Sequence, residues 1–300
     1  MTYSIVARDP ATGDLGVAVQ SHYFSVGSVV PWAEAGVGAV ATQATASPDY
    51  GPRGVALMRD GLSAPQALAS LVEADPGRDV RQVAMVDAQG NAAAHTGQRC
   101  IEAAGHVIGA GFSVQANMML DAIVWPAMRD AFLAAQGDIA DRLLAALDAA
   151  QRAGGDIRGQ QSAAILVVRG ERMEKPWRGV LFDLNVEDHP RPLDELRRLV
   201  RLKRAYALAD AGDDAMGERR IDEAAALYRR AVDTAPEVDE LQFWAGVSLF
   251  REGRAGEAAQ LLRSAFAANP ALADLVPRLV HLGMVRAEDI ATVVAHREDR

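Results

Sequence analysis

The opening stretch of the chain, TYSIVARDPATGDLGVAVQ at residues 2–20, decides how the rest is interpreted. Its two ends, residues 2–7 and 15–20, are rich in apolar and β-branched side chains, and the segment 9–14 between them contains a proline and a glycine. This pattern is typical of two antiparallel strands joined by a tight turn. The first strand begins at Thr2 with no polar lead, so we expect the start of the chain to lie at the end of a sheet.

Strand and helix patterns alternate as far as residue 188. Further strands are predicted at 27–30, 36–42, 80–87, 92–96, 106–115, 163–169 and 179–184. Helices are predicted at 51–61, 63–75, 120–135 and 138–153. Short strands on both sides of pairs of helices indicate an α+β sandwich with two layers of strands.

The chain becomes almost wholly helical after a short polar segment. Pro190 and Pro192 cannot continue a helix. We therefore place a linker at residues 189–193, between a first domain at 1–188 and an all-α domain at 194–300.

The second domain contains a repeat with a period of 34 residues, because Ala235-Pro236 recurs as Asn269-Pro270. The positions before each proline also match: Gly212 with Gly246, Ala224 with Ala258, Tyr228 with Leu262 and Ala231 with Ala265. Small residues at such positions and a closing proline are typical of tetratricopeptide helix pairs, which would offer a surface to a protein or peptide partner. A generic alanine-rich helical bundle is the alternative.

Composition excludes several classes of protein. The net charge of −9 makes binding to a nucleic-acid backbone unfavourable. No apolar run is long enough to span a membrane, and no charged and then apolar leader is visible, so we expect a cytoplasmic protein. Cys100 is the single cysteine, and the histidines lack metal-ligand spacing, so neither a metal site nor a cofactor is expected.

The start of the chain, Met1-Thr2, provides a candidate catalytic nucleophile. Methionine aminopeptidase removes an initiator methionine that precedes a small residue such as threonine. Thr2 would then carry a free α-amine with a pKa near ~8, which can accept the proton of its own hydroxyl. A nucleophile at the start of the first strand, followed by a hairpin, a strand and a helix, is the element order of N-terminal-nucleophile hydrolases.

At this point the chain resembles the DUF1028 family. The similarity covers roughly residues 2–200, and its motifs lie at 2–9, 15–19, 36–43, 50–54, 111–118 and 159–164. The family is assigned to the N-terminal-nucleophile hydrolase superfamily. The resemblance therefore implies a four-layer αββα sandwich with Thr2 at the nucleophile position, here followed by the helical-repeat domain.

Three residues near the ends of early strands are candidates for roles beside Thr2. Ser21 and His22 follow the second strand, where His22 would orient or protonate groups near Thr2 and Ser21 would contact substrate. Gln43 ends the strand 36–42 and is a candidate for an oxyanion hole or for amide recognition. The alternatives are a loop histidine and a polar strand edge.

Further polar residues are candidates for substrate binding. Arg53 begins a helix and would clamp a substrate carboxylate, unless it is an ordinary surface arginine. Gln115 and Asn117 end an apolar strand, where buried amides either bind substrate or satisfy the backbone of the fold. Gln161 and Ser162 belong to a polar cluster before the strand 163–169, and Ser162 would bond the amine of Thr2.

Two functions follow as hypotheses. The first is an amidohydrolase that attacks a small amide or acyl-amino compound with Thr2. The second is a non-catalytic binding or scaffolding protein. The second gains some support from composition, because proteasome-like relatives use a lysine on an early strand, whereas this chain has no lysine before Lys175. Sandwich folds with exposed strand edges commonly associate, so a homodimer is expected.

Overall fold

The structure is a computed structural model that describes residues 2–295 and divides into two compact units between Val200 and Arg201. The division falls inside helix α5 (Pro192–Gly217) and not in the predicted linker at 189–193. The reason is packing, because Leu193, Leu196 and Val200 are buried in the core of the first unit.

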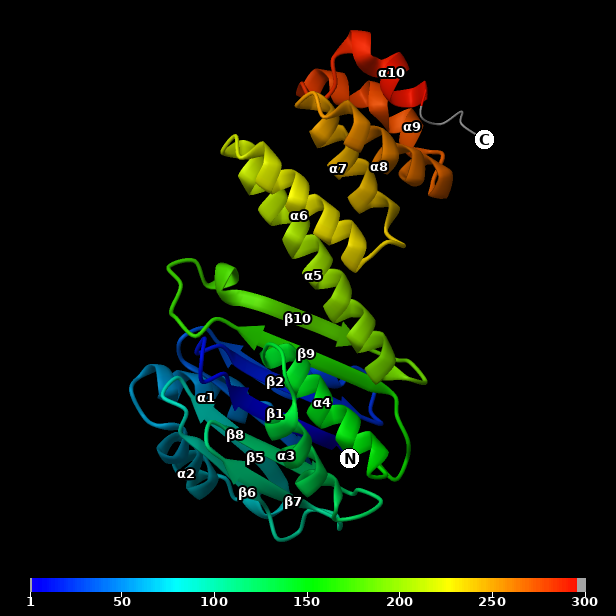
Figure 1. Ribbon diagram of the computed structural model, residues 1–300. Helices are drawn as coiled ribbons and strands as arrows, with labels where there is room; N and C mark the ends of the chain where they lie inside the picture. Colours follow the sequence, from blue (N-terminus) through cyan, green and yellow to red (C-terminus); the bar gives the residue numbers. More distant parts are fainter. Residues whose placement is uncertain (1, 296–300) are drawn as a thin grey trace. The chain divides into compact units, whose positions relative to one another are not determined.

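The first unit contains two antiparallel sheets (Figure 1). The six-stranded sheet has the order β10-β9-β2-β1-β8-β7. Its strands are β1 (Thr2–Arg8), β2 (Leu15–Ser21), β7 (Gly105–Gly109), β8 (Phe112–Asn117), β9 (Ser162–Val168) and β10 (Val180–Val186). The four-stranded sheet runs in the order β3 (Pro31–Glu34), β4 (Gly38–Ala44), β5 (Arg81–Asp87) and β6 (Ala92–Thr96). The predicted opening hairpin is β1 and β2, paired from Thr2 with Ser21 to Arg8 with Leu15.

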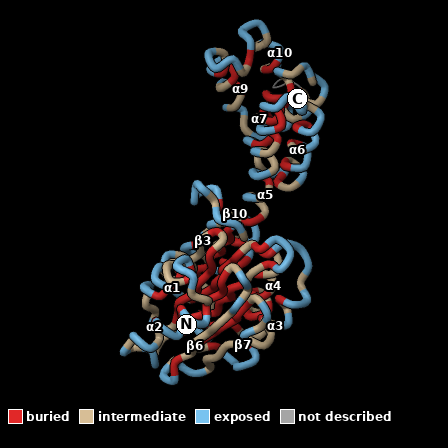
Figure 2. Tube along the Cα trace, turned by 90° about the vertical axis from the view of Figure 1, so that its left-hand side faces the viewer, coloured by how far each residue is buried: buried red, intermediate tan, exposed pale blue. Residues whose placement is uncertain are grey.

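Alternation along the strands divides the buried side chains of the first unit into separate clusters. Figure 2 colours the buried residues red along the trace of the chain. On β1, Val6 packs between the two sheets, whereas Tyr3 and Ile5 face α3 (Val124–Ala134) and α4 (Ile139–Arg152). On the four-stranded sheet, Val40 and Met85 face α1 (Tyr50–Arg59) and α2 (Ala64–Ala74). Each sheet is therefore covered by the other sheet on one face and by a pair of helices on the other.

One strand differs from the sequence prediction. Residues 27–30 do not form a strand; a short 3-10 turn at Val26–Ser28 precedes β3, which begins at Pro31. Within this turn Gly27 packs closely against Asn185, since a Cβ on Gly27 would lie 1.6 Å from the side-chain oxygen of that residue. Proline at the first residue of an edge strand removes no hydrogen bond that the sheet needs.

The second unit is helical. After the end of α5 it contains α6 (Ile221–Thr234), α7 (Asp239–Arg251), α8 (Ala255–Ala268), α9 (Leu272–Leu275) and α10 (Ile290–Ala295). The chain is thus a mixed α/β region followed by a helical region, as its sequence predicted. Within residues 2–295, none of the helices combines the length and the apolar character that crossing a membrane requires.

The residues of the 34-residue period occupy matching places in this unit. A Cβ on Gly212 would lie 2.6 Å from the ring of Tyr228, and a Cβ on Gly246 would lie 2.8 Å from the side chain of Leu262. The two glycines therefore each allow a large side chain of the next helix to approach. Both Tyr228 and Leu262 are buried in the same core cluster.

Candidate functional site

Thr2 lies at the end of the central strand of the six-stranded sheet. Its neighbours across the sheet are Ser21 on β2 and Asn117 on β8. The residue is only 5% exposed, and its Oγ1 lies 3.0 Å from the Oγ of Ser21. Two hydroxyl groups thus share a hydrogen bond at the sheet end, and either oxygen can be the donor.

The backbone carbonyl of Thr2 is held from both sheets. Gln43, at the end of β4, donates from Nε2 to the Thr2 oxygen at 3.1 Å. Asn117 donates to the same oxygen at 3.4 Å. The start of β1 is therefore fixed by side chains as well as by the sheet.

Gln82, the second residue of β5, is the centre of a buried amide network between the sheets. Its Oε1 accepts hydrogen bonds from Gln43 at 2.7 Å and from Asn117 at 2.9 Å. Its Nε2 lies 2.9–3.2 Å from the Thr96 hydroxyl and two backbone carbonyls. Because Gln82 is fully buried, these bonds satisfy an amide that would otherwise destabilise the fold.

Gln115 joins the same network. Its Nε2 donates to the hydroxyl of Ser4 at 3.2 Å and to the carbonyl of Ala41 at 3.3 Å. Ser4 in turn donates to the Oε1 of Gln43 at 2.6 Å. These bonds satisfy polar groups of the fold, one of the two roles that the sequence left open for Gln115 and Asn117. The Oε1 of Gln115 is buried and has no hydrogen-bond partner within residues 2–295.

The side chain of Gln43 is fully used by these contacts. Its amide group donates to the Thr2 carbonyl and to Gln82, and its oxygen accepts from Ser4. This arrangement leaves no side-chain amide hydrogen of Gln43 for an oxyanion, and the predicted role would then fall to backbone N–H groups.

His22 lies beside a buried carboxylate. Its backbone N–H donates to Asp156 at 3.1 Å, and Asp156 also accepts from the backbone and guanidinium of Arg158 at 2.9–3.2 Å. The Nδ1 of His22 is buried and has no hydrogen-bond partner within residues 2–295. Asp156 also contributes to raising the pKa of Tyr3, after the larger effect of burial, so this phenol stays neutral.

The hydroxyl of Ser162, at the start of β9, bonds to the loop after β2. Ser162 pairs with Ser21 across the β2–β9 register, and its hydroxyl donates to the carbonyl of Tyr23 and accepts from the N–H of Val26 at 3.1 Å. These bonds anchor the loop after β2. The neighbouring Gln161 accepts a hydrogen bond from the backbone of His189 through its own carbonyl.

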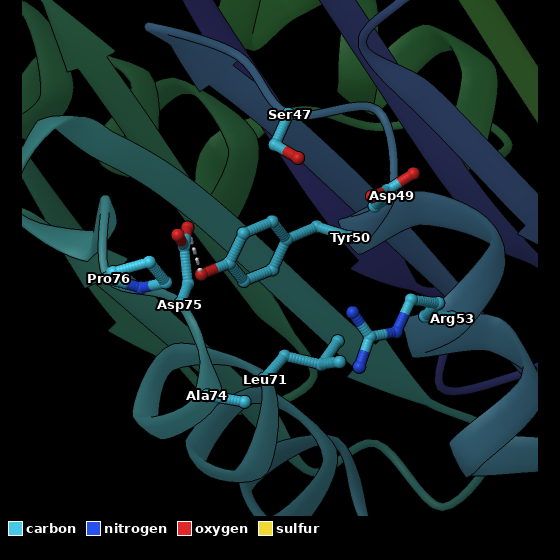
Figure 3. A pocket seen from close by; sticks show the side chains of 8 residues that line it. All are labelled: Ser47, Asp49, Tyr50, Arg53, Leu71, Ala74, Asp75 and Pro76. Carbon is cyan, nitrogen blue, oxygen red and sulfur yellow. Dashed lines mark hydrogen bonds between the residues drawn. The ribbon is translucent and has the colours of Figure 1, made fainter.

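Arg53 lines a separate cavity near the start of α1, where it lies with Ser47, Tyr50 and Asp75 (Figure 3). Thr2 is not among the residues that line this cavity. The predicted set is therefore divided: Ser21, Gln43 and Asn117 contact Thr2 directly, whereas Arg53 belongs elsewhere.

The sequence interpretation missed Gln82 and Ser4. The available signal was the period of two along each strand, which places Gln82 on the same face as the inter-sheet residues Ala84 and Val86. In the part of the chain that the structure describes, no group of three or more His, Cys, Asp or Glu side chains is placed to hold a metal ion.

Comparison with known proteins identifies relatives of the first unit. Residues 2–196 match the model of the family of unknown function DUF1028. The chain is also similar to a solved structure, that of protein SPO2555 from Silicibacter pomeroyi, which belongs to DUF1028. The identity is 36% and the TM-score is 0.60, over 66% of this chain and 87% of the other. None of the curated proteins matched the chain.

Proposed function

This chain belongs to the DUF1028 family, and from that premise we propose that its first unit is an N-terminal-nucleophile amidohydrolase with a four-layer αββα sandwich. The packing of α3 and α4 on the six-stranded sheet and of α1 and α2 on the four-stranded sheet supports this assignment. So does the position of Thr2 at the end of a central strand.

The observation that carries the proposal is the fixed geometry of Thr2. Its hydroxyl lies 3.0 Å from that of Ser21, and its carbonyl is bonded by Gln43 and Asn117. A nucleophile that is already held in one position loses less entropy on reaching the transition state. The same bonds satisfy a buried backbone carbonyl, so they fix the position of Thr2 in either role.

The proposed reaction begins when Met1 is removed, a residue outside those that the structure describes. The Oγ1 of Thr2 attacks the amide carbon of a small amide or acyl-amino compound, and its proton passes to the Thr2 amine, directly or through the hydroxyl of Ser21. The carbon–nitrogen bond then breaks, and the leaving nitrogen takes that proton. Water hydrolyses the resulting ester and restores the Thr2 hydroxyl.

The remaining residues have supporting roles in this proposal. Gln43, Asn117 and Gln82 position the backbone of Thr2 and touch no reacting atom. The oxyanion would be held by backbone N–H groups, since the amide of Gln43 is already used.

We also propose that the second unit is a tetratricopeptide-like module that binds a protein or peptide partner. The equivalent contacts of Gly212 with Tyr228 and of Gly246 with Leu262 support it, because they recur with the sequence period.

A comparison of three variants tests the catalytic proposal. Hydrolysis of a panel of amides, acyl-amino acids and small peptides should disappear in Thr2→Ala, persist at a reduced rate in Thr2→Ser, and stay unchanged in Thr45→Ala, an exposed control. Hydrolysis that survives in Thr2→Ala would contradict the role of Thr2. A wild-type protein that hydrolyses none of the panel would favour the non-catalytic binding protein.

A further inference from the structure

A small polar cavity lies between the start of α1 and the end of α2, apart from Thr2. Its volume is about 200 Å³. Figure 3 shows the guanidinium of Arg53 turned toward Leu71 and the ring of Tyr50, with Ser47 and Asp49 on the other side of that ring. This volume is below the ~300 Å³ at which pockets for drug-sized ligands begin, so the cavity suits a ligand of only a few heavy atoms.

The carboxylate of Asp75, on one wall of the cavity, is held by three hydrogen bonds. Asp75 accepts hydrogen bonds from the hydroxyl of Tyr50 at 3.1 Å, the Nε of Arg81 at 2.9 Å and the N–H of Gly77 at 2.7 Å. Its charge is compensated by Arg81, with which it forms an ion pair. This wall therefore neither moves freely nor repels an anionic group as an isolated carboxylate would.

Two further charged side chains line the cavity. Asp49 and Arg53 are four residues apart, a spacing at which an acid followed by an arginine commonly forms an ion pair. Both are exposed, and neither has a side-chain hydrogen bond or an ion pair within residues 2–295. A positive and a negative side chain thus border the same cavity, and each is available to a ligand.

We propose that this cavity binds a small zwitterion of the α-amino acid class. The guanidinium of Arg53 would take the carboxylate in a bidentate pair, and the carboxylate of Asp49 would take the ammonium group. The side chain of Leu71 would pack against a short apolar substituent. A ligand that carries both charges pairs with both Arg53 and Asp49. A simple anion pairs only with Arg53, and a simple amine pairs only with Asp49.

The cavity is separate from the proposed hydrolase site. Thr2, Ser21 and the buried amide network do not line the cavity. Binding of an amino acid here is therefore expected in Thr2→Ala as in the wild type, and either proposal can fail without the other.

The test is an amide chemical-shift titration of the full chain with four probes: glycine, L-alanine, acetate and methylammonium. Glycine and L-alanine should shift the amide signals of residues around the cavity, among them Gly77. Acetate and methylammonium should bind at least about tenfold more weakly, because each makes only one of the two charge-assisted contacts. Arg53→Gln and Asp49→Asn should each weaken alanine binding by about tenfold or more.

The matched control is Arg263→Gln, which removes an exposed helical arginine of the second unit. It should leave alanine binding unchanged. Equal binding of acetate and alanine would overturn the zwitterion assignment and leave a simple anion site. The absence of cavity shifts with both amino acids, or an equal loss of binding in Arg263→Gln, would overturn the site itself.

Discussion

Replacing Gln82 by alanine tests whether the buried amide network stabilises the start of β1. The side-chain oxygen of Gln82 accepts bonds of 2.7 Å from Gln43 and 2.9 Å from Asn117. Its nitrogen lies 2.9–3.2 Å from three further oxygen atoms. The substitution removes all of these contacts at a position that water does not reach.

The expected loss follows from the partners left behind. A hydrogen bond contributes about 0.5–1.5 kcal/mol net, and an unsatisfied buried partner costs more. Gln43 and Asn117 both keep their bonds to the carbonyl of Thr2, so neither becomes fully unsatisfied. We therefore expect a loss near the lower end of the range that five such hydrogen bonds would give, about 3 kcal/mol in the free energy of unfolding.

Hydrogen exchange of β1 and β5 peptides in increasing urea measures this free energy for the first unit alone. The matched control is Gln89→Ala, in the exposed turn after β5, which should change the free energy by less than about 0.5 kcal/mol. A loss below about 1 kcal/mol in Gln82→Ala, or one equal to that of the control, would refute the network as a stabilising element.

Three other predictions concern packing and ionisation. Gly246→Ala should destabilise the second unit by about 1–2 kcal/mol because the new methyl group meets Leu262 at 2.8 Å, whereas Gly256→Ala, with nothing within 4 Å, should stabilise it slightly in the same thermal unfolding assay. Burial raises the pKa of Asp75, but its hydrogen bonds to Arg81 and other donors lower it more. The stability that ionised Asp75 contributes is thus complete above pH ~4 and is lost as the pH falls through the lowered native pKa. Asp75→Asn should lower the free energy of unfolding by about 1–2 kcal/mol at neutral pH. Urea titrations should show that this difference between variant and wild type disappears in acid. A difference that does not change with pH would contradict the stabilising role of ionised Asp75. Burial and the hydrogen bond to Asp75 raise the pKa of Tyr50 to about 12. In a spectrophotometric pH titration, Tyr50→Phe should therefore lack one tyrosine that ionises near this pH in the wild type.

Local patterns were sufficient to predict most strands but not every boundary. The opening hairpin and the hairpin of β5 and β6 follow directly from apolar runs separated by turn residues. The strand expected at 27–30 was wrong: a 3-10 turn stands there, and Gly27 packs against Asn185, which is distant in sequence. No local pattern contains that contact.

The candidate site was partly predictable for a similar reason. Ser21 and Asn117 were chosen as polar residues at strand ends, and the register of β1 with β2 and β8 places both opposite Thr2. Gln82 was missed because a glutamine near the start of a strand is ordinarily exposed, and only the opposite sheet makes it a buried hub. The cavity at Arg53 needed the packing of α1 against α2, which no motif encodes.

The intact mass of the purified protein shows whether Thr2 carries a free α-amine. We expect a mass lower than that of the full sequence by one methionine residue, which would leave Thr2 as the first residue. A protein that retains Met1 has no amine on Thr2 to accept the proton, and that result would contradict the proposed mechanism.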